Sequence, residues 1–206
     1  MSIPLIVGVG GFTSNVGKTT LMCELLHAFP GWEAIKTTRG HYRSCGKLPE
    51  ACCVSHLIGD EPIIRSGRVQ TYEPGKDTGR YWDAGAANVH WLIATDEQID
   101  VGIHQTLARV RSQGVFVEGN SFADFVDPDF FVMLKRSDKE VIKRSARRAL
   151  KKTSALFVVD CDNDGKLHSK IECSSYFSGP VRCGTSFGGL VGWISSQLTC
   201  ATSGSV

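Results

Sequence analysis

No apolar stretch in this chain of 206 residues approaches the length that a helix needs to cross a bilayer. Charge of one sign is also scarce, because a formal net charge of +2 is too near neutral to favour binding to nucleic acid or to a membrane surface. The first residues lack the basic region of a signal peptide. These absences predict a cytoplasmic protein that binds neither membranes nor nucleic acids.

The chain has no internal repeat, no linker and no Cys-x-x-Cys pair. It does contain eight cysteines, but a chain of this size can bury a core without disulfides, so reduced thiols are expected. We therefore expect a single domain over residues 1–206.

The most informative segment is Gly11–Thr20, which reads Gly-Phe-Thr-Ser-Asn-Val-Gly-Lys-Thr-Thr. It follows the apolar run Ile3–Val9, and a helical pattern begins after it at Leu21. A strand, a glycine-containing turn, a Lys-Thr pair and a helix together predict a phosphate-binding loop, because N–H groups and the dipole at a helix start attract anions. An ordinary glycine turn that contains Lys-Thr is the alternative.

In this loop, the Lys18 ammonium can reach the terminal phosphates and the Thr19 hydroxyl can bind Mg²⁺. The common spacing would place glycine at position 12, where Phe12 stands, so counting from Gly11 makes the loop one residue longer. The residues expected around the phosphates are Gly11, Thr13, Ser14, Asn15, Val16, Gly17, Lys18, Thr19 and Thr20.

Apolar runs and helical patterns alternate along the rest of the chain. Strands are predicted at about 32–37, 89–94, 115–117, 130–134 and 156–159, and helices at about 78–87, 99–110, 138–152 and 190–198. Residues 38–76 show no sustained period and are expected to form an irregular insert. The alternation predicts an α/β protein with the three-layer P-loop NTPase fold, a mainly parallel sheet with helices on both faces.

A second acidic group is predicted at the end of the strand 115–117. Glu118 follows this apolar run, and Gly119 lets the chain turn close to the phosphates. Nucleotide hydrolysis uses such an acid to orient the water shell of the metal, so Glu118 is a candidate catalytic residue and Mg²⁺ ligand together with Thr19. A strand-terminal carboxylate that points to solvent is the alternative.

Three segments carry a family resemblance. The Gly-Lys-Thr loop paired with Val117-Glu118-Gly119 is similar to the dethiobiotin synthetase-like branch of P-loop proteins. The segment Pro74–Ala86 resembles the Gly-Lys-Asp-Ser/Thr…Ala-Gly-Ala signature of the molybdopterin-guanine dinucleotide biosynthesis adapter proteins of MobB type. Ile35-Lys36-Thr37 stands where that family has Ile-Lys-His. The family's histidine-rich stretch is absent here, and the insert is much longer.

The resemblance implies a nucleotide-binding protein, for GTP or ATP with Mg²⁺, that assists attachment of a guanine nucleotide to molybdopterin. It implies phosphate and metal binding by Lys18 and Thr19, the strand-end acid role for Glu118, and positions for Lys36 and Asp77 near the nucleotide. The partners implied are a molybdopterin guanylyltransferase or a molybdoenzyme, and a second copy in a homodimer.

The insert contains five residues that can bind a soft or borderline metal. They are His41, Cys45, Cys52, Cys53 and His56. Their number suffices for a tetrahedral Zn²⁺ site, but adjacent cysteines both bind only with an unusual turn, so incidental thiols are the favoured interpretation. We predict that the purified protein carries little stoichiometric zinc.

Nine lysines and arginines lie between Lys135 and Lys152. A solvated helix face explains them, and docking of an anionic ligand or partner is the sharper alternative. No Asn-Lys-x-Asp sequence follows the strand at 156–159, so the base stays open. Three functions remain: a GTP-binding molybdenum-cofactor adapter, which we favour; an ATP-dependent small-molecule kinase or dethiobiotin synthetase-like ligase; and a metal-delivery GTPase that uses the insert. Slow NTP hydrolysis is compatible with all three.

Overall fold

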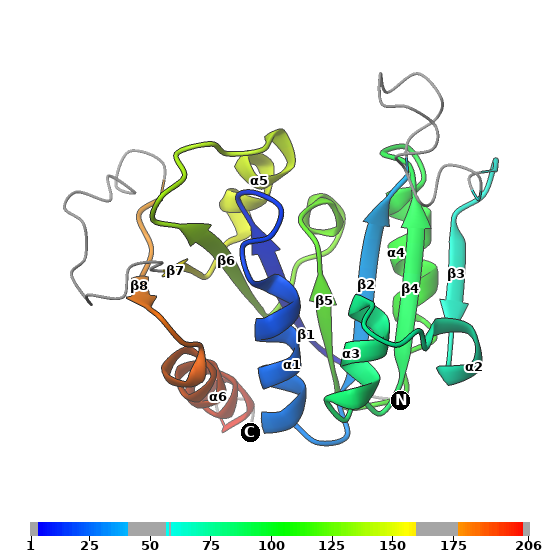
Figure 1. Ribbon diagram of the computed structural model, residues 1–206, viewed down its shortest axis with the longest axis horizontal. Helices are drawn as coiled ribbons and strands as arrows, with labels where there is room; N and C mark the ends of the chain where they lie inside the picture. Colours follow the sequence, from blue (N-terminus) through cyan, green and yellow to red (C-terminus); the bar gives the residue numbers. More distant parts are fainter. Residues whose placement is uncertain (1–3, 41–56, 58, 160–176, 204–206) are drawn as a thin grey trace.

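The computed structural model describes residues 4–40, 57, 59–159 and 177–203. Eight strands form one sheet in the order β3-β4-β2-β5-β1-β6-β7-β8, shown in Figure 1. Every neighbouring pair is parallel except β3 and β4. The strands are β1 (Leu5–Gly11), β2 (Glu33–Arg39), β3 (Ile63–Ser66), β4 (Val89–Ala94), β5 (Gly114–Glu118), β6 (Phe130–Arg136), β7 (Ala155–Val159) and β8 (Val181–Gly184).

Helices lie on both faces of this sheet (Figure 1). The α-helices are α1 (Lys18–Ala28), α2 (Arg68–Thr71), α3 (Asp77–Asp83), α4 (Ile99–Leu107), α5 (Arg144–Ala149) and α6 (Gly188–Ser203). Two 3₁₀-helices, η3 (Ser121–Asp124) and η4 (Leu150–Lys152), precede and follow the segment that holds β6 and α5. The predicted α/β architecture, a mainly parallel sheet with helices on both faces, is confirmed.

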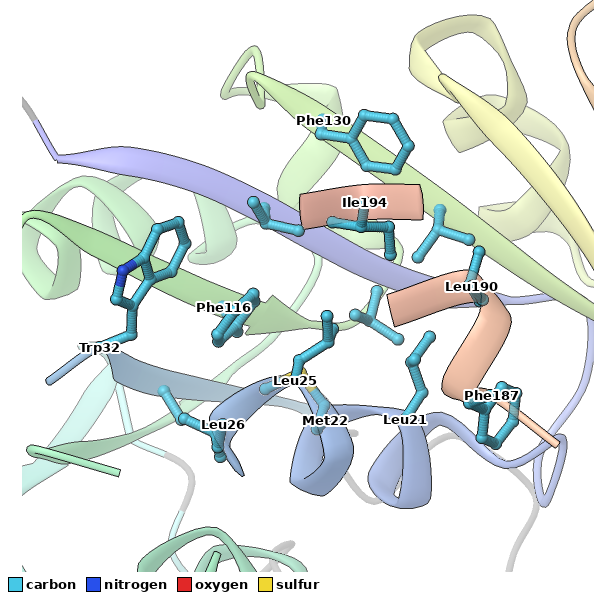
Figure 2. Close-up of a cluster of buried hydrophobic side chains, with 14 of the residues drawn as sticks. Leu21, Met22, Leu25, Leu26, Trp32, Phe116, Phe130, Phe187, Leu190 and Ile194 are labelled. Carbon is cyan, nitrogen blue, oxygen red and sulfur yellow. The ribbon is translucent and has the colours of Figure 1, made fainter. Parts of the chain in front are cut away.

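The two faces of the sheet are buried because successive strand residues point in opposite directions. In β5, Phe116 packs in the core beneath α1, α3 and α6, whereas Val115 and Val117 pack in the core beneath α4 and α5. Figure 2 shows the first core, where α1 places Leu21, Met22, Leu25 and Leu26 against the sheet. Strands that are buried on both faces are apolar at successive positions, which explains why short apolar runs in the sequence predicted the central parallel strands.

The expected irregular insert at 38–76 differs from the structure in its second half. Strand β3 and helix α2 lie within it, and β3 pairs antiparallel with β4 at the sheet edge. All four residues of β3 are only partly buried, so no clear hydrophobic alternation marks them in the sequence. Pairing with β4, a tertiary contact, makes this segment a strand.

The expected basic helix at about 138–152 is shorter in the structure. Helix α5 begins at Arg144 and ends at Ala149, and η4 continues it to Lys152. The preceding chain instead reaches the loop after β1, where the Lys143 N–H donates to the carbonyl of Phe12 at 3.0 Å. This contact replaces the first helical turns, and the sequence pattern also missed the exposed edge strand β8.

Within the parts of the chain that the structure describes, none of the helices combines the length and apolar character that crossing a bilayer requires.

A buried carboxylate joins β2 to β4 and to the turn before β5. Glu33 is 3% exposed, and its Oε2 lies 2.7 Å from Nε2 of His90. Its Oε1 accepts the N–H groups of Arg111 and Ser112 at 2.8 and 2.9 Å. Burial acts to raise the pKa of Glu33, but these hydrogen bonds outweigh it and the pKa is lowered.

We expect Glu33→Gln to lower the free energy of unfolding at pH 7 by about 2 kcal/mol, because a charge-assisted network loses its charge. A lowered pKa stabilises the fold above the unfolded-state pKa, and this contribution disappears as pH falls through the folded-state pKa. The difference between wild type and variant should therefore shrink below about pH 4. Urea unfolding at several pH values measures it, with exposed Glu97→Gln as the control; a difference that is independent of pH would contradict the assignment.

Candidate nucleotide-binding site

The loop between β1 and α1 enters the helix through a glycine in the left-handed conformation. Gly17 precedes α1 with φ +93°, in the left-handed region, and a Cβ there would lie 2.9 Å from Cζ of Phe187. Among the described residues, no side chain caps the start of α1, and its first turn contains no acidic residue. The N–H groups at the start of this eleven-residue helix, before Leu21, are therefore available to an anion.

Phe12 explains the departure from the common loop spacing. Its side chain is 2% exposed and packs in the core beneath α4 and α5, and its N–H donates to the carbonyl of Leu134 at 2.9 Å. Position 12 thus prolongs the contact of β1 with β6 rather than opening the loop. Val16, a further loop residue, is also buried, whereas Ser14 and Asn15 are exposed.

Asn120 fixes the start of the loop. Its Oδ1 accepts the Gly11 N–H and its Nδ2 donates to the Gly11 carbonyl, both at 2.9 Å. A Cβ on Gly11 would lie 2.5 Å from Cγ1 of Val16, so the loop closes tightly at this point. Sequence reasoning missed Asn120, although its place directly after Glu118 and Gly119 was the available signal.

Glu118 lies at the carboxyl end of β5 and is 2% exposed. Its Oε1 is 2.6 Å from Nζ of Lys36 and 3.9 Å from Nζ of Lys18. Its Oε2 accepts from the hydroxyl of Thr19 at 3.3 Å and from the hydroxyl of Tyr81. The carboxylate therefore points into the site and not to solvent.

Lys36 connects Glu118 to a second carboxylate. Its Nζ lies 2.6 Å from Oδ2 of Asp77, which stands at the start of α3. Three segments that are distant in sequence, at 36, 77 and 118, thus meet beside the loop at 11–19. The sheet explains why these segments meet, because β2 and β5 are parallel neighbours and their carboxyl ends lie on the same side of the molecule.

Burial and charge act against each other on these groups. Burial lowers the pKa of Lys18 and outweighs the opposing effect of Glu118. Burial acts in the same direction on Lys36, but Glu118 and Asp77 overcome it, so the pKa of Lys36 is raised. For Asp77, burial acts to raise the pKa, and the Lys36 ammonium outweighs it and lowers the pKa. Lys36 is thus held as a cation between two carboxylates.

The donor chemistry beside the loop fits Mg²⁺. Thr19, Asp77 and Glu118 bring a hydroxyl and two carboxylates together, and hard oxygen ligands are those that Mg²⁺ prefers. Asp77 also lies within hydrogen-bonding reach of the Thr19 hydroxyl, so all three side chains lie together. Sequence reasoning named Thr19 and Glu118 as metal ligands and placed Asp77 only near the nucleotide.

Tyr81, on α3, contacts Glu118 from the protein interior, and sequence reasoning did not name it as a site residue. It is fully buried, and burial followed by the charge of Glu118 raises its pKa well above the ordinary value. Its hydroxyl therefore stays protonated and donates to Glu118. Together with Lys36, it holds the carboxylate in a fixed orientation.

An open cavity of about 490 Å³ lies over the loop and the start of α1. Ser14, Asn15, Val16, Gly17, Lys18, Thr19, Thr20, Lys36, Asp77, Arg80 and Glu118 line it. The structure thus brings together the predicted loop residues from 14 to 20 with Lys36, Asp77 and Glu118, and it adds Arg80. Thr13 does not line this cavity; its buried hydroxyl lacks a hydrogen-bond partner among the described residues.

The predicted second metal set, His41, Cys45, Cys52, Cys53 and His56, lies outside the described residues. Among the residues that are described, no group of three or more His, Cys, Asp or Glu side chains could hold a metal ion. The zinc prediction therefore stays a prediction.

At the level of sequence, neither a family model nor a curated protein matches this chain. In structure, the chain is similar to LpxK from Aquifex aeolicus in complex with ATP, with 15% identity and a TM-score of 0.50 over 88% of this chain. The chain has the P-loop NTPase fold. FtsY, a signal recognition particle receptor from Elizabethkingia anophelis, matches with 14% identity and a TM-score of 0.42 over 90% of this chain.

This chain covers 54% of the LpxK chain and 60% of the FtsY chain. At such identities the likeness to LpxK concerns the fold, and the function must be argued from the site. The nature of the nucleotide, the partners and the roles of individual residues are matters for proposal.

Proposed function

We propose that the loop at 11–19 binds the phosphates of a nucleoside triphosphate together with Mg²⁺. The observation that carries this proposal is the convergence of Lys18, Thr19, Lys36, Asp77 and Glu118 around an uncapped helix start. A polyphosphate would be attracted by two ammonium groups and by the first-turn N–H groups. The two carboxylates would bind a metal ion that the phosphates also bind.

In this proposal each residue has a separate task. The first-turn N–H groups and Lys18 hold the β- and γ-phosphates, and Asn120 keeps the loop in the conformation that exposes those groups. Thr19, Asp77 and Glu118 would hold Mg²⁺, which would neutralise charge on the terminal phosphates when bound. The Lys36 ammonium offsets the negative charge of the two carboxylates and adds positive potential near the phosphates. Any hydrolysis would then depend on positioning and charge neutralisation.

We assign the protein, within this class, to GTP-dependent adapter work in molybdopterin-guanine dinucleotide biosynthesis. The support is the spatial meeting of the segments that resemble the MobB-type adapters, since Lys36, Asp77 and Glu118 come from three of them. The proposal includes a single domain in the cytoplasm, a homodimer, and a molybdopterin guanylyltransferase or molybdoenzyme as partner.

A second candidate is an ATP-dependent kinase or dethiobiotin synthetase-like ligase that acts on a small anionic substrate. The observation that favours it is a second cavity, of about 320 Å³, which shares Lys18 with the nucleotide cavity. Turnover that depends on a small molecule would favour this candidate over the adapter.

Calorimetric titration of the protein with GTP and ATP, each with and without Mg²⁺, tests the proposal. We expect binding that Mg²⁺ strengthens and a preference for GTP. Equal and weak binding in all four titrations would remove the assignment to nucleotide binding. Tight Mg²⁺-dependent binding with a preference for ATP would retain the site and replace the adapter by the second candidate.

A further inference from the structure

A second cavity, of about 320 Å³, lies at the carboxyl ends of β2, β4 and β5. Arg39 contributes from the end of β2, Thr95 and Asp96 from the turn after β4, and Ser121 from the turn after β5. Lys143 enters from the chain after β6. In parallel α/β sheets, ligands bind outside the carboxyl ends of the strands, and this volume is at the lower end of the range for ligand pockets.

The cavity lies next to the proposed nucleotide site. Lys18 lines both cavities, and its ammonium is the group proposed to hold the terminal phosphates. Lys143 also connects them, because its Nζ donates to the hydroxyl of Ser14 in the loop at 2.6 Å while its side chain lines the second cavity. A molecule in the second cavity would therefore lie against the terminal phosphate of the nucleotide.

The charged groups around the cavity favour an anion. Three cationic side chains, Lys18, Arg39 and Lys143, line it together with one carboxylate, Asp96. Arg39 forms an ion pair with Asp96 in which both side chains are about half exposed, at 53% and 49%. An exposed ion pair of this kind is weak, so an incoming oxyanion can share the guanidinium at little cost.

Thr95 is an independent sign of a ligand. The residue is 5% exposed and lines the cavity, and its hydroxyl has no hydrogen-bond partner among the described residues. A buried hydroxyl without a partner is energetically costly, and such groups are rare in native structures. The hydroxyl oxygen is itself shielded from solvent, so it would reach an oxygen atom of a bound molecule in the cavity once the side chain turns toward it.

We propose that this cavity binds a small molecule that carries an oxyanion, a phosphate or a carboxylate, and holds it beside the terminal phosphate of the nucleotide. Arg39 and Lys143 would bind the oxyanion, and the Thr95 hydroxyl would form a hydrogen bond to it or to a neighbouring oxygen. The position beside the terminal phosphate rests on the proposed nucleotide site, whereas the affinity of the cavity for an oxyanion does not.

The test uses inorganic phosphate and, in a separate arm, acetate. Each is titrated into the protein saturated with Mg²⁺ and a β,γ-imido nucleotide, which keeps the loop occupied, and binding is followed by calorimetry and, for phosphate, by ³¹P line broadening. We expect one anion per chain with millimolar affinity, weakened at least fivefold by Arg39→Gln and by Thr95→Val. Thr95→Ser, which keeps the hydroxyl, should bind as wild type. The arm that binds more tightly distinguishes phosphate from carboxylate.

Asp96→Asn provides a test of sign, because removing the one carboxylate should strengthen anion binding. Arg182→Gln, on β8 at the opposite sheet edge, is the charge-matched control and should change nothing. Absence of binding by both anions up to 50 mM (roughly −2 kcal/mol), or binding that ignores Arg39 and Thr95, would overturn the proposal. The same titrations without nucleotide separate the two proposals: a failure to bind nucleotide removes the proposed function, while anion binding that Arg39 and Thr95 control keeps the cavity.

Discussion

Replacement of Lys18 by alanine is expected to weaken nucleotide binding at least 100-fold, equivalent to about 2.7 kcal/mol. Lys18 is the loop ammonium that lines both cavities, and it lies 3.9 Å from the Glu118 carboxylate. The variant removes this cation. It also leaves the negative charge of Glu118 less compensated, so that this carboxylate would repel the phosphates. Charged partners in a partly buried site typically lose 2–5 kcal/mol when one is truncated.

Calorimetry with GTP and ATP measures the effect of Lys18→Ala, and circular dichroism verifies that the fold is kept. Lys139→Ala, which removes an exposed lysine from the chain after β6, is the matched control and should bind as wild type. Nucleotide affinity within threefold of wild type in the Lys18 variant would remove this residue from the site.

Replacement of Glu118 by glutamine is expected to reduce the gain in nucleotide affinity from Mg²⁺ at least tenfold, or about 1.4 kcal/mol. The amide retains an oxygen that can accept from Tyr81 and Thr19, but it lacks the charge that a hard cation requires. Without Mg²⁺ the variant should bind nucleotide more tightly than wild type, because a carboxylate no longer repels the phosphates. The effect of the substitution on nucleotide affinity therefore has opposite signs with and without Mg²⁺.

This change of sign distinguishes a metal ligand from a structural residue. A merely destabilised site would lose affinity both with and without Mg²⁺, and that result would contradict the assignment of Glu118. Glu61→Gln, an exposed carboxylate outside both cavities, is the control. Asp77→Asn should follow Glu118→Gln with a smaller effect, since Asp77 is 42% exposed and better screened by water.

Much of the site could be read from local sequence patterns. The loop at 11–19 was predicted from a strand, a glycine turn and a helix start, which are all set by neighbours in the chain. Glu118 was predicted in the same way, from the apolar run before it. The phosphate-binding role of these residues stays a prediction, whereas their positions at the carboxyl ends of β1 and β5 are established by the fold.

The partners of these residues were not readable. Asn120, Tyr81 and Lys143 reach the site from three different segments, and their contacts depend on the order of strands in the sheet. The sequence pattern placed Lys143 inside a basic helix, because it has helical spacing to apolar neighbours. The hydrogen bond from its N–H to Phe12, more than a hundred residues away, decides otherwise.

The sequence by itself determined that strands and helices alternate, that the sheet is mainly parallel, and where the loop between β1 and α1 begins. These features follow from apolar periodicity and glycine conformations, which act over a few neighbouring residues. Only the tertiary structure decided that Lys36, Asp77 and Glu118 form one group, that β3 and β8 are edge strands, and that a cavity lined by Thr95 lies beside Lys18. The physical reason is that ion pairs, edge pairing and cavities depend on distances between segments far apart in the chain, which local preferences do not specify.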